Sequence, residues 1–494
     1  MINKEYFILF RTFVKTKQLM QIQFLGATRE VTGSKFLITT KGGKKILLDC
    51  GMYQGKGMET DTLNRTLGFN PQEIDYMLLS HAHIDHSGLI PYIYRLGFRG
   101  SIITTAATRS LCAYMLADSA GIQEADTKQY NKKADIQHLK KITPLYVDEN
   151  AKKCMELFIT TDFNRRFYIN DEISVKFYPI GHLLGAGCIC LDIKENGKVK
   201  RIAYTGDIGR ENSNILKSPE PFPQCDYLIT ESTYGDRIHE PEENVKQYLY
   251  EIVKHTCVEK RGKLIIPSFA VGRTQEVLYI LNELYNEHKL PAIKVFVDSP
   301  LAVNATNVFH EYPEYLNDKV RNMLLYDNDP FGFNSVTYVK SVEQSKAINK
   351  YRKPCIIISA SGMLEAGRVK HHVANNIMKP NNTILMVGYC APSTLGARIQ
   401  EKGLKKISIF GSEIALRAEI KSIEAFSGHG DYKEMIKYLK CQDANRIKNI
   451  FLVHGEYETQ KTYMQHLQAS GFRNIIIPQI NDRYVLQDEE AVKI

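Results

Sequence analysis

The stretch that decides the fold reads Ser80-His81-Ala82-His83-Ile84-Asp85-His86-Ser87. It follows an apolar run from Tyr76 to Leu79 and leads into Gly88-Leu89-Ile90-Pro91, so we place it where a strand passes into a loop. Imidazole and carboxylate ligands together suit zinc, manganese or iron and suit magnesium poorly. The alternative is a solvated polar loop, but an ordinary core has little use for four titratable groups in one turn. Four ligands this close in sequence are unlikely to converge on one ion, so the spacing predicts two adjacent metals.

Length and composition indicate a globular chain of two or three domains. The 494 residues are 44 % hydrophobic and 24 % charged, and the longest apolar runs are strand-sized, so we predict no membrane-spanning helix. Charges at Lys4, Glu5, Arg11, Lys15 and Lys17 lie on either side of the apolar residues 7–10 and leave too short an apolar segment, so we expect no signal peptide, and residues 1–19 are interpreted as an appendage. The ten scattered cysteines favour reduced thiols in a cytoplasm. A net charge of +9 weakly favours an anionic partner such as nucleic acid.

Short apolar runs along the chain repeatedly end at or just before a residue that can bind a metal. The residues concerned are Asp49, His81, Asp207, Glu231 and His454. Alone, an aspartate after a strand is more often a turn former, and a lone histidine is more often structural. Together, these residues would gather along one edge of a sheet, where ligands bind in sheet-based enzymes.

The pattern changes between residues 236 and 424. Strand and helix alternate there over longer units, for example a strand at 263–266 followed by a helix from about 274 to 287. Such alternation predicts a parallel, doubly wound sheet. Earlier in the chain we expect helices at about 87–96 and 107–120, and a charged helical cap or lid at 121–160. The first pattern returns near residue 425 with Phe426-Ser427-Gly428-His429-Gly430-Asp431.

These motifs carry a family resemblance. His-x-His-x-Asp-His after a strand, with a later Gly-His, Gly-Asp and His-Gly, resembles the metallo-β-lactamase superfamily. Glu-Ser-Thr-Tyr-Gly at 231–235, the insertion at 236–424 and the return through Ser-Gly-His-Gly-Asp resemble its β-CASP branch, which contains RNA nucleases. The resemblance implies an α/β fold: an αββα metallo-β-lactamase sandwich from residues 20–235 and 425–494, with an inserted, doubly wound α/β β-CASP domain.

The resemblance also implies a site with two zinc ions. The first ion would be held by His81, His83 and His182, the second by Asp85, His86 and His454, and Asp207 would bind both. Asp49 would orient ligands and water. Histidine at position 454 favours RNA, because DNA-processing members usually have valine there.

The expected chemistry is hydrolysis of an RNA phosphodiester bond by a metal-bridging hydroxide, giving a 5′-phosphate and a 3′-hydroxyl. With Asp85 and Asp207, the residues expected to carry the reaction are Glu231 and His429. His429, oriented by Glu231, would protonate the departing 3′-oxygen. The alternative for His429 is a helix cap within a glycine-rich turn.

The insertion is interpreted as a clamp for the substrate. Ser359, Ser361 and Gly362 form a small-residue loop after a strand, which suits phosphate binding through backbone N–H groups and hydroxyls. Arg273 and Arg398 are candidate phosphate contacts, although each alone is more often a surface charge. Residues 359–363 do not closely match the phosphate pocket of RNase J, so sensing of an RNA 5′ end is left open.

Two other functions compete with a ribonuclease that acts on single-stranded RNA. One is a small-molecule thioesterase or lactonase of the same superfamily; the bulk of the insertion argues against it. The other is a non-catalytic RNA-binding subunit, although here every expected ligand position is filled. The sequence does not separate endonuclease from exonuclease action, and a homodimer is an expectation from the family alone.

Overall fold

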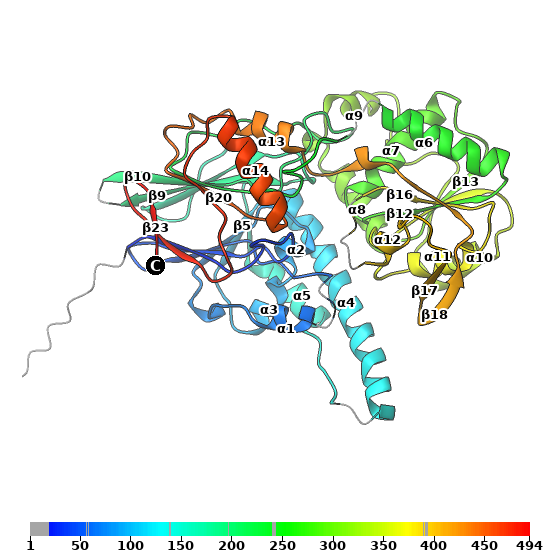
Figure 1. Ribbon diagram of the computed structural model, residues 1–494, viewed down its shortest axis with the longest axis horizontal. Helices are drawn as coiled ribbons and strands as arrows, with labels where there is room; N and C mark the ends of the chain where they lie inside the picture. The colour runs from blue at the N-terminus through cyan, green and yellow to red at the C-terminus, as the bar shows by residue number, and fades with distance from the viewer. Residues whose placement is uncertain are drawn as a thin grey trace, which may run out of the picture.

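Three main β-sheets organise the chain into two halves (Figure 1). The computed structural model describes residues 19–494 apart from 56, 58, 138–139, 196, 240–243, 389 and 391–393, and of Gln137 and Glu424 it describes the backbone only. The appendage predicted at residues 1–19 lies outside the described residues except for Leu19. Two of the sheets build one half, and the third builds the other.

The first sheet has eight strands in the order β23-β22-β1-β2-β3-β4-β5-β6. Strands β3 to β6 run parallel to one another, whereas the pairs from β23 to β3 are antiparallel. Its strands are β1 (Gln21–Phe24), β2 (Phe36–Thr39), β3 (Lys45–Leu48), β4 (Tyr76–Leu78), β5 (Ser101–Thr104), β6 (Phe158–Thr160), β22 (Arg483–Leu486) and β23 (Ala491–Lys493).

The second sheet has seven strands in the order β21-β20-β11-β10-β9-β8-β7. Its strands are β7 (Phe167–Tyr168), β8 (Ile173–Pro179), β9 (Gly187–Glu195), β10 (Lys198–Tyr204), β11 (Tyr227–Thr230), β20 (Asn449–Leu452) and β21 (Ile475–Ile476). Strand β20 follows the insertion in sequence and pairs in parallel with β11, which precedes it. This pairing brings the two separated parts of the chain into one sheet.

The two sheets pack face to face through an apolar core that includes Phe24, Phe36, Ile202 and Phe451. The rings of Phe24 and Phe451, one from each sheet, lie 4.9 Å apart between centroids. Helices cover both outer faces (Figure 1), so the αββα sandwich is confirmed. These helices are α1 (Glu59–Arg65), α2 (Ile84–Ser87), α3 (Ile90–Arg95), α4 (Ala106–Gln137) and α5 (Asp148–Lys153) beside the first sheet, and α13 (Tyr432–Leu439) and α14 (Tyr457–Ala469) over the second.

The third sheet belongs to the insertion and is parallel throughout, in the order β14-β13-β15-β12-β16-β19. Its strands are β12 (Lys263–Pro267), β13 (Lys294–Val297), β14 (Val336–Tyr338), β15 (Cys355–Ser359), β16 (Thr383–Met386) and β19 (Glu419–Ser422). Strands β12, β15 and β16 are buried along their whole length, as expected of a parallel sheet covered on both faces. The predicted doubly wound sheet is confirmed.

Helices surround this third sheet, and a small hairpin extends from it (Figure 1). The helices are α6 (Val245–Val253), α7 (Arg273–Asn286), α8 (Pro300–Glu311), α9 (Asp318–Met323), α10 (Val342–Lys350), α11 (Val369–Asn376) and α12 (Leu395–Arg398). The hairpin consists of β17 (Lys406–Ile409) and β18 (Ser412–Ala415).

Two helices differ from their predicted bounds. The helix expected at about 87–96 is α3, which begins only at Ile90 because Pro91 lacks an N–H and favours the first turn of a helix, and Ser87 instead ends the short α2. The helix expected to end near 120 continues as α4 to Gln137. Gly121, which weakens a helix, is tolerated within α4 at an exposed position with open space around it.

Candidate metal centre

The candidate site lies where strand ends from the two sandwiched sheets meet. Asp49 follows β3, His81 comes shortly after β4, Asp207 after β10, and His454 after β20. The backbone adopts the left-handed conformation at Asp49 (φ 56°) and His454 (φ 50°). Non-glycine residues seldom take this conformation, and those that do cluster at functional sites. Side chains that are far apart in the sequence thereby meet at one edge of the sandwich.

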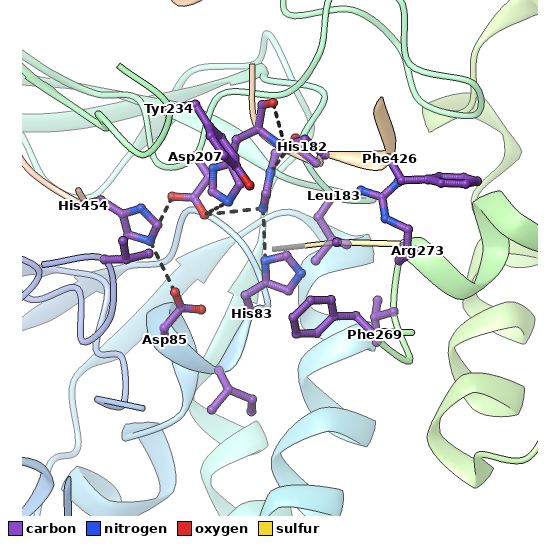
Figure 2. A pocket seen from close by; sticks show the side chains of 18 of the residues that line it. His83, Asp85, His182, Leu183, Asp207, Tyr234, Phe269, Arg273, Phe426 and His454 are labelled. Carbon is purple, nitrogen blue, oxygen red and sulfur yellow. Dashed lines mark hydrogen bonds and ion pairs between the residues drawn. The ribbon is translucent and has the colours of Figure 1, made fainter. Parts of the chain in front are cut away.

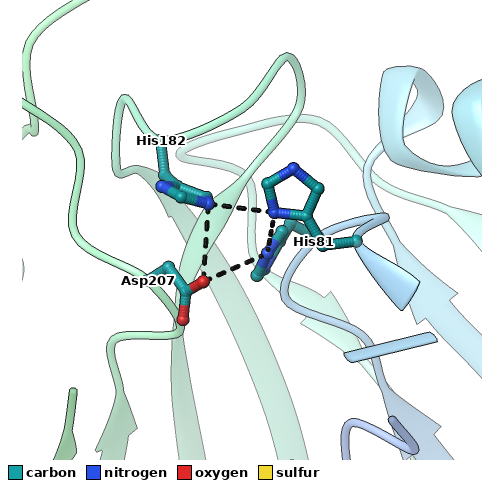
Figure 3. A group of neighbouring side chains, drawn as sticks. His81, His182 and Asp207 are labelled. Atoms are coloured by element: carbon teal, nitrogen blue, oxygen red, sulfur yellow. Dashed lines mark hydrogen bonds and ion pairs between the residues drawn. The ribbon is translucent and has the colours of Figure 1, made fainter. Parts of the chain in front are cut away.

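A first cluster brings three imidazole rings together beside a carboxylate (Figure 3). His83 Nδ1 lies 3.1 Å from His81 Nε2 and 3.0 Å from His182 Nε2. The Gly428 carbonyl can only accept, so the 2.9 Å contact from His182 Nδ1 places the proton on Nδ1 and a lone pair on Nε2. Asp207 Oδ2 lies 3.5 Å from His81 Nε2 and 3.4 Å from His182 Nε2.

Burial keeps these imidazoles neutral. It lowers the pKa of His83 to about 4, and, together with neighbouring imidazoles, it lowers the pKa of His81 and His182 well below the usual value. Neutral imidazole is the form that binds metals.

A second cluster lies beside the first. His86 Nδ1 lies 2.7 Å from Asp49 Oδ2 and donates to it, and His86 Nε2 lies 3.2 Å from Asp207 Oδ1 and 3.9 Å from Asp85 Oδ2. Burial by itself lowers the pKa of His86, but the Asp207 and Asp85 carboxylates outweigh it and raise that pKa well above the usual value. His454 Nε2 lies 3.3 Å from Asp85 Oδ2 and 3.6 Å from Asp207 Oδ1. Burial raises the pKa of Asp85, but the adjacent His86 and His454 outweigh it and lower that pKa to about 2.

Asp207 faces both clusters, with Oδ2 toward the first and Oδ1 toward the second. Its Oδ1 atom is buried, with His86 Nε2 at 3.2 Å and His454 Nε2 at 3.6 Å. Nitrogen and oxygen atoms of imidazoles and carboxylates therefore converge from two sides on one space. The residues present fit divalent metal ions, for which this mixture of nitrogen and oxygen ligands is suited.

Asp49 holds the second cluster in place. Its Oδ1 accepts from Ser80 N at 2.7 Å, and its Oδ2 accepts from Ser80 Oγ at 2.6 Å, from His86 Nδ1 at 2.7 Å and from Tyr204 Oη at 2.7 Å. All four residues are buried. Sequence reasoning did not identify Tyr204; the available signal was its position three residues before Asp207, at the end of an apolar run.

His429 and Glu231 form a separate pair next to the clusters. His429 Nδ1 lies 3.1 Å and 3.0 Å from the two carboxylate oxygens of Glu231, which is fully buried and also accepts from Ile208 N. Nε2 on the far side of the ring lies 4.0 Å from Asp207 Oδ2. Burial by itself lowers the pKa of His429, but the Glu231 carboxylate outweighs that effect and raises the pKa to about 9. The imidazole is thus held with Nε2 toward the metal-ligand candidates.

A cavity of about 490 Å³ opens over these clusters, and both halves of the molecule line it (Figure 2). The volume is within the range of roughly 300–1,000 Å³ that is typical of ligand sites. The lining is charged near the clusters and apolar toward the insertion. Its members include His83, Asp85, His182, Leu183, Asp207, Tyr234, Phe269, Arg273, Glu276, Met363, Phe426, His429 and His454.

Arg273 lies beside the first cluster. Its guanidinium pairs with Glu276 and lies 5.3 Å from the centroid of the Phe426 ring. A Cβ atom built on Gly428 would lie 3.6 Å from Arg273 Nη2 and 3.4 Å from His182 Cε1, so the guanidinium and this imidazole flank the same glycine. Of the residues predicted to bind substrate, Arg273 is the one that lines the cavity.

The structure does not bring the other four predicted substrate contacts to the cavity lining. Ser359 is buried, and its Oγ donates to Asp298 O at 2.8 Å; Ser361 Oγ donates to Ala366 O at 3.4 Å. These hydroxyls satisfy nearby backbone carbonyls and are not presented to a phosphate. Gly362 packs against the ring of Phe269, and Arg398 is exposed on α12.

Comparison with known families adds to this geometry. Residues 29–238 match the metallo-beta-lactamase superfamily, residues 274–399 the Beta-Casp domain, and residues 413–478 a Zn-dependent metallo-hydrolase RNA specificity domain. A ribonuclease of Thermus thermophilus is 33 % identical over 440 residues, covering 89 % of this chain and 94 % of that protein.

The chain belongs to the β-CASP family of metallo-β-lactamase-fold nucleases.

Other proteins are similar over a comparable share of this chain. An RNase J-like protein of Methanocaldococcus jannaschii is 32 % identical over 89 % of this chain and 93 % of its own length. The cleavage and polyadenylation specificity factor 73 of Drosophila melanogaster is 31 % identical over 89 % of this β-CASP chain and 60 % of its own length. A crystal structure of a protein of unknown function from Enterococcus faecalis shares the fold with a TM-score of 0.51 at 14 % identity, covering 95 % of this chain and all of that one.

In the described part of the β-CASP chain, every helix is too short or too polar to cross a bilayer.

Proposed function

We propose that this chain is a zinc-dependent ribonuclease that hydrolyses phosphodiester bonds of single-stranded RNA. The observation that carries the proposal is Asp207, whose two carboxylate oxygens face two separate ligand sets beside the His429–Glu231 pair. Relatives that match nearly the whole chain are named as a ribonuclease and an RNase J-like protein, which supports RNA as the substrate. Zinc is supported by the ligand types and by the Zn-dependent family that residues 413–478 match.

Two ions would occupy the two ligand sets. The proposed ligands are His81, His83 and His182 for one ion, Asp85, His86 and His454 for the other, and Asp207 for both. When bound, the ions lower the pKa of a water molecule enough to make it a nucleophile near neutral pH, and they offset the negative charge that builds on the phosphoryl oxygens.

The chain's own residues would complete the reaction. As water attacks phosphorus, the bond from phosphorus to the 3′-oxygen breaks, and that oxygen needs a proton. His429 would supply the proton from Nε2, because Glu231 holds Nδ1 and directs Nε2 toward the clusters. The products would be a 5′-phosphate and a 3′-hydroxyl. Arg273, with Glu276 fixing its guanidinium, would hold a neighbouring phosphate.

The decisive experiment uses the purified protein and single-stranded RNA labelled at either end. We expect cleavage with zinc and none with a chelator; internal fragments would identify an endonuclease and mononucleotides an exonuclease. If zinc-loaded protein cleaves no RNA but hydrolyses a thioester or a lactone, the proposal is wrong and the small-molecule alternative replaces it.

A double variant tests the assignment of the second ion. Asp85→Ala with His86→Ala should abolish cleavage and lower the bound metal, while much RNA binding remains. The matched control is His255→Ala with Glu259→Ala, which removes a surface imidazole–carboxylate pair joined at 3.1 Å outside the cavity. Full cleavage by the Asp85/His86 variant would refute the two-metal assignment.

A further inference from the structure

Phe269 stands out among the residues that line the cavity. It lies two residues after β12 and is 36 % exposed, in a chain whose other cavity-facing phenylalanine, Phe426, is fully buried. Its carbonyl accepts from Thr274 Oγ1 at 2.7 Å and from Thr274 N at 3.2 Å, which closes residues 269–274 into a tight turn at the start of α7. The phenyl ring is therefore presented by a fixed backbone.

Two glycines lie behind the ring. A Cβ atom built on Gly362 would lie 3.0 Å from Phe269 Cδ2, and one built on Gly388 would lie 3.7 Å from Cε2. The ring thus rests against bare backbone from two loops of the insertion. This arrangement supports one side of the ring, while the rest of it contributes to the cavity wall.

The surroundings of the ring are apolar, with a cation close by. Met115 from α4, Leu183 and Met363 line the same cavity, and Arg273 belongs to the same turn as Phe269. Figure 2 shows Phe269 and Arg273 at the side of the cavity toward the insertion, with Leu183 between Arg273 and His182 and the Phe269 ring beside His83. A flat apolar surface and a guanidinium that line one cavity match the two parts of a nucleotide, its base and its phosphate.

We propose that Phe269 and Arg273 form a one-nucleotide subsite beside the metal-ligand clusters, in which a nucleobase stacks on Phe269 while its phosphate pairs with Arg273. The proposal rests on the ribonuclease function above and specifies how the substrate is held. A base must be unpaired to stack on this ring, so the subsite requires single-stranded RNA. Because stacking does not depend on the hydrogen-bonding groups of the base, the subsite tolerates any of the four bases. Gly362, predicted from the sequence to bind phosphate, acts here as the support for the ring.

Abasic substitution tests the stacking directly. A set of single-stranded RNAs carries one abasic nucleotide at successive positions around the cleavage site. Wild-type protein should show a loss in kcat/KM at one position, roughly 5- to 150-fold, as expected for one base stacked on an aromatic ring. Phe269→Ala should lose that position-specific difference, and Phe269→Tyr should retain it. Phe410→Ala, which removes a 56 % exposed ring outside the cavity, is the control and should behave as wild type.

A binding measurement separates this proposal from the ribonuclease function. The probe is an RNA whose scissile linkage has a methylene group in place of the leaving oxygen and which carries 2-aminopurine at the sensitive position. Stacking should quench its fluorescence on binding to zinc-loaded wild type, and Phe269→Ala should not quench it. Quenching without cleavage of ordinary RNA would reject the ribonuclease and keep the subsite. Equal quenching by both proteins, or an abasic penalty that survives in Phe269→Ala, would overturn the subsite.

Discussion

The substitution Tyr204→Phe tests whether the buried groups behind the metal-ligand candidates control metal binding. Its hydroxyl donates to Asp49 Oδ2 at 2.7 Å, and the same oxygen accepts from His86 Nδ1 at 2.7 Å. Tyr204→Phe removes this donor and keeps the ring, which packs edge-on against Phe36 with centroids 5.4 Å apart. The change leaves no buried donor unsatisfied, and Asp49 retains its contacts with Ser80 and His86.

The expected effects of Tyr204→Phe follow from these contacts. A hydrogen bond to a charged group contributes about 1.5–3 kcal/mol to stability. Because Asp49 keeps three other donors, we expect the free energy of unfolding to fall by the lower value, about 1.5 kcal/mol. Mutation of a group that orients a ligand imidazole typically lowers metal affinity 10- to 100-fold, so we expect Tyr204→Phe to lower zinc affinity about tenfold. Competition with a chromophoric chelator measures the affinity, and thermal unfolding of the zinc-free protein measures the stability.

Tyr227→Phe is the matched control for this experiment. Tyr227 lies on the neighbouring strand β11 in the same apolar core, and its hydroxyl donates to the Gln487 carbonyl, outside the cavity lining. It should lower stability without changing zinc affinity. The reasoning is refuted if Tyr204→Phe loses stability but binds zinc as tightly as wild type and Tyr227→Phe do, because Tyr204 would then be a core residue only.

Three further outcomes are expected. His429→Ala should lower kcat by about 10²- to 10⁴-fold, the range for loss of a general acid, while RNA binding measured by gel shift is retained; an unchanged kcat would remove His429 from the reaction. Arg273→Ala should raise KM for RNA about tenfold in steady-state kinetics, whereas Arg398→Ala should leave KM unchanged. An equal rise in KM in both variants would contradict the placement of Arg398 outside the cavity. Asp298→Ala should destabilise the protein by about 3–5 kcal/mol in a denaturant titration, because it leaves the buried His372 and the half-buried Arg368 without their carboxylate partner; a loss below about 1 kcal/mol would show that the network relaxes.

The sequence predicted the fold well because the deciding signals are local. The apolar runs at 76–79 and 263–266 are bounded by residues unsuited to a strand interior, so the positions of β4 and β12 could be read to within one residue. The parallel third sheet followed from strand–helix alternation, which leaves few other topologies. Residues 121–137 were predicted as part of a separate helical cap, but their continuity with the preceding helix in α4 was not predicted, because this second half is largely exposed and lacks an apolar periodicity.

Residue type and spacing were weaker guides to the residues that contact the substrate. A serine in a small-residue loop suits phosphate binding, but it suits a buried contact equally, and tertiary packing directs Ser359 to the Asp298 carbonyl. Tyr204 and Phe269 were missed for the same reason, since each is an ordinary aromatic residue in sequence. Their special contacts, with Asp49 in one case and with Gly362 and Gly388 in the other, come from segments far away in the chain.

The proposed general acid depends on the place of the insertion in the chain. Glu231 lies at the end of β11, just before the insertion, and His429 follows shortly after it, yet the two side chains meet at 3.0 Å. The first strand after His429 is β20, which belongs to the sandwich and pairs with β11. The same junction therefore holds the acid in place and joins the insertion to the sandwich. Arg273 and Phe269 belong to the insertion, which also contacts the sandwich directly, for example where Asn214 Nδ2 donates to Glu276 Oε1 at 2.7 Å. The group that would protonate the leaving oxygen and the groups that would hold the RNA are therefore positioned by this junction together with such contacts between the two halves.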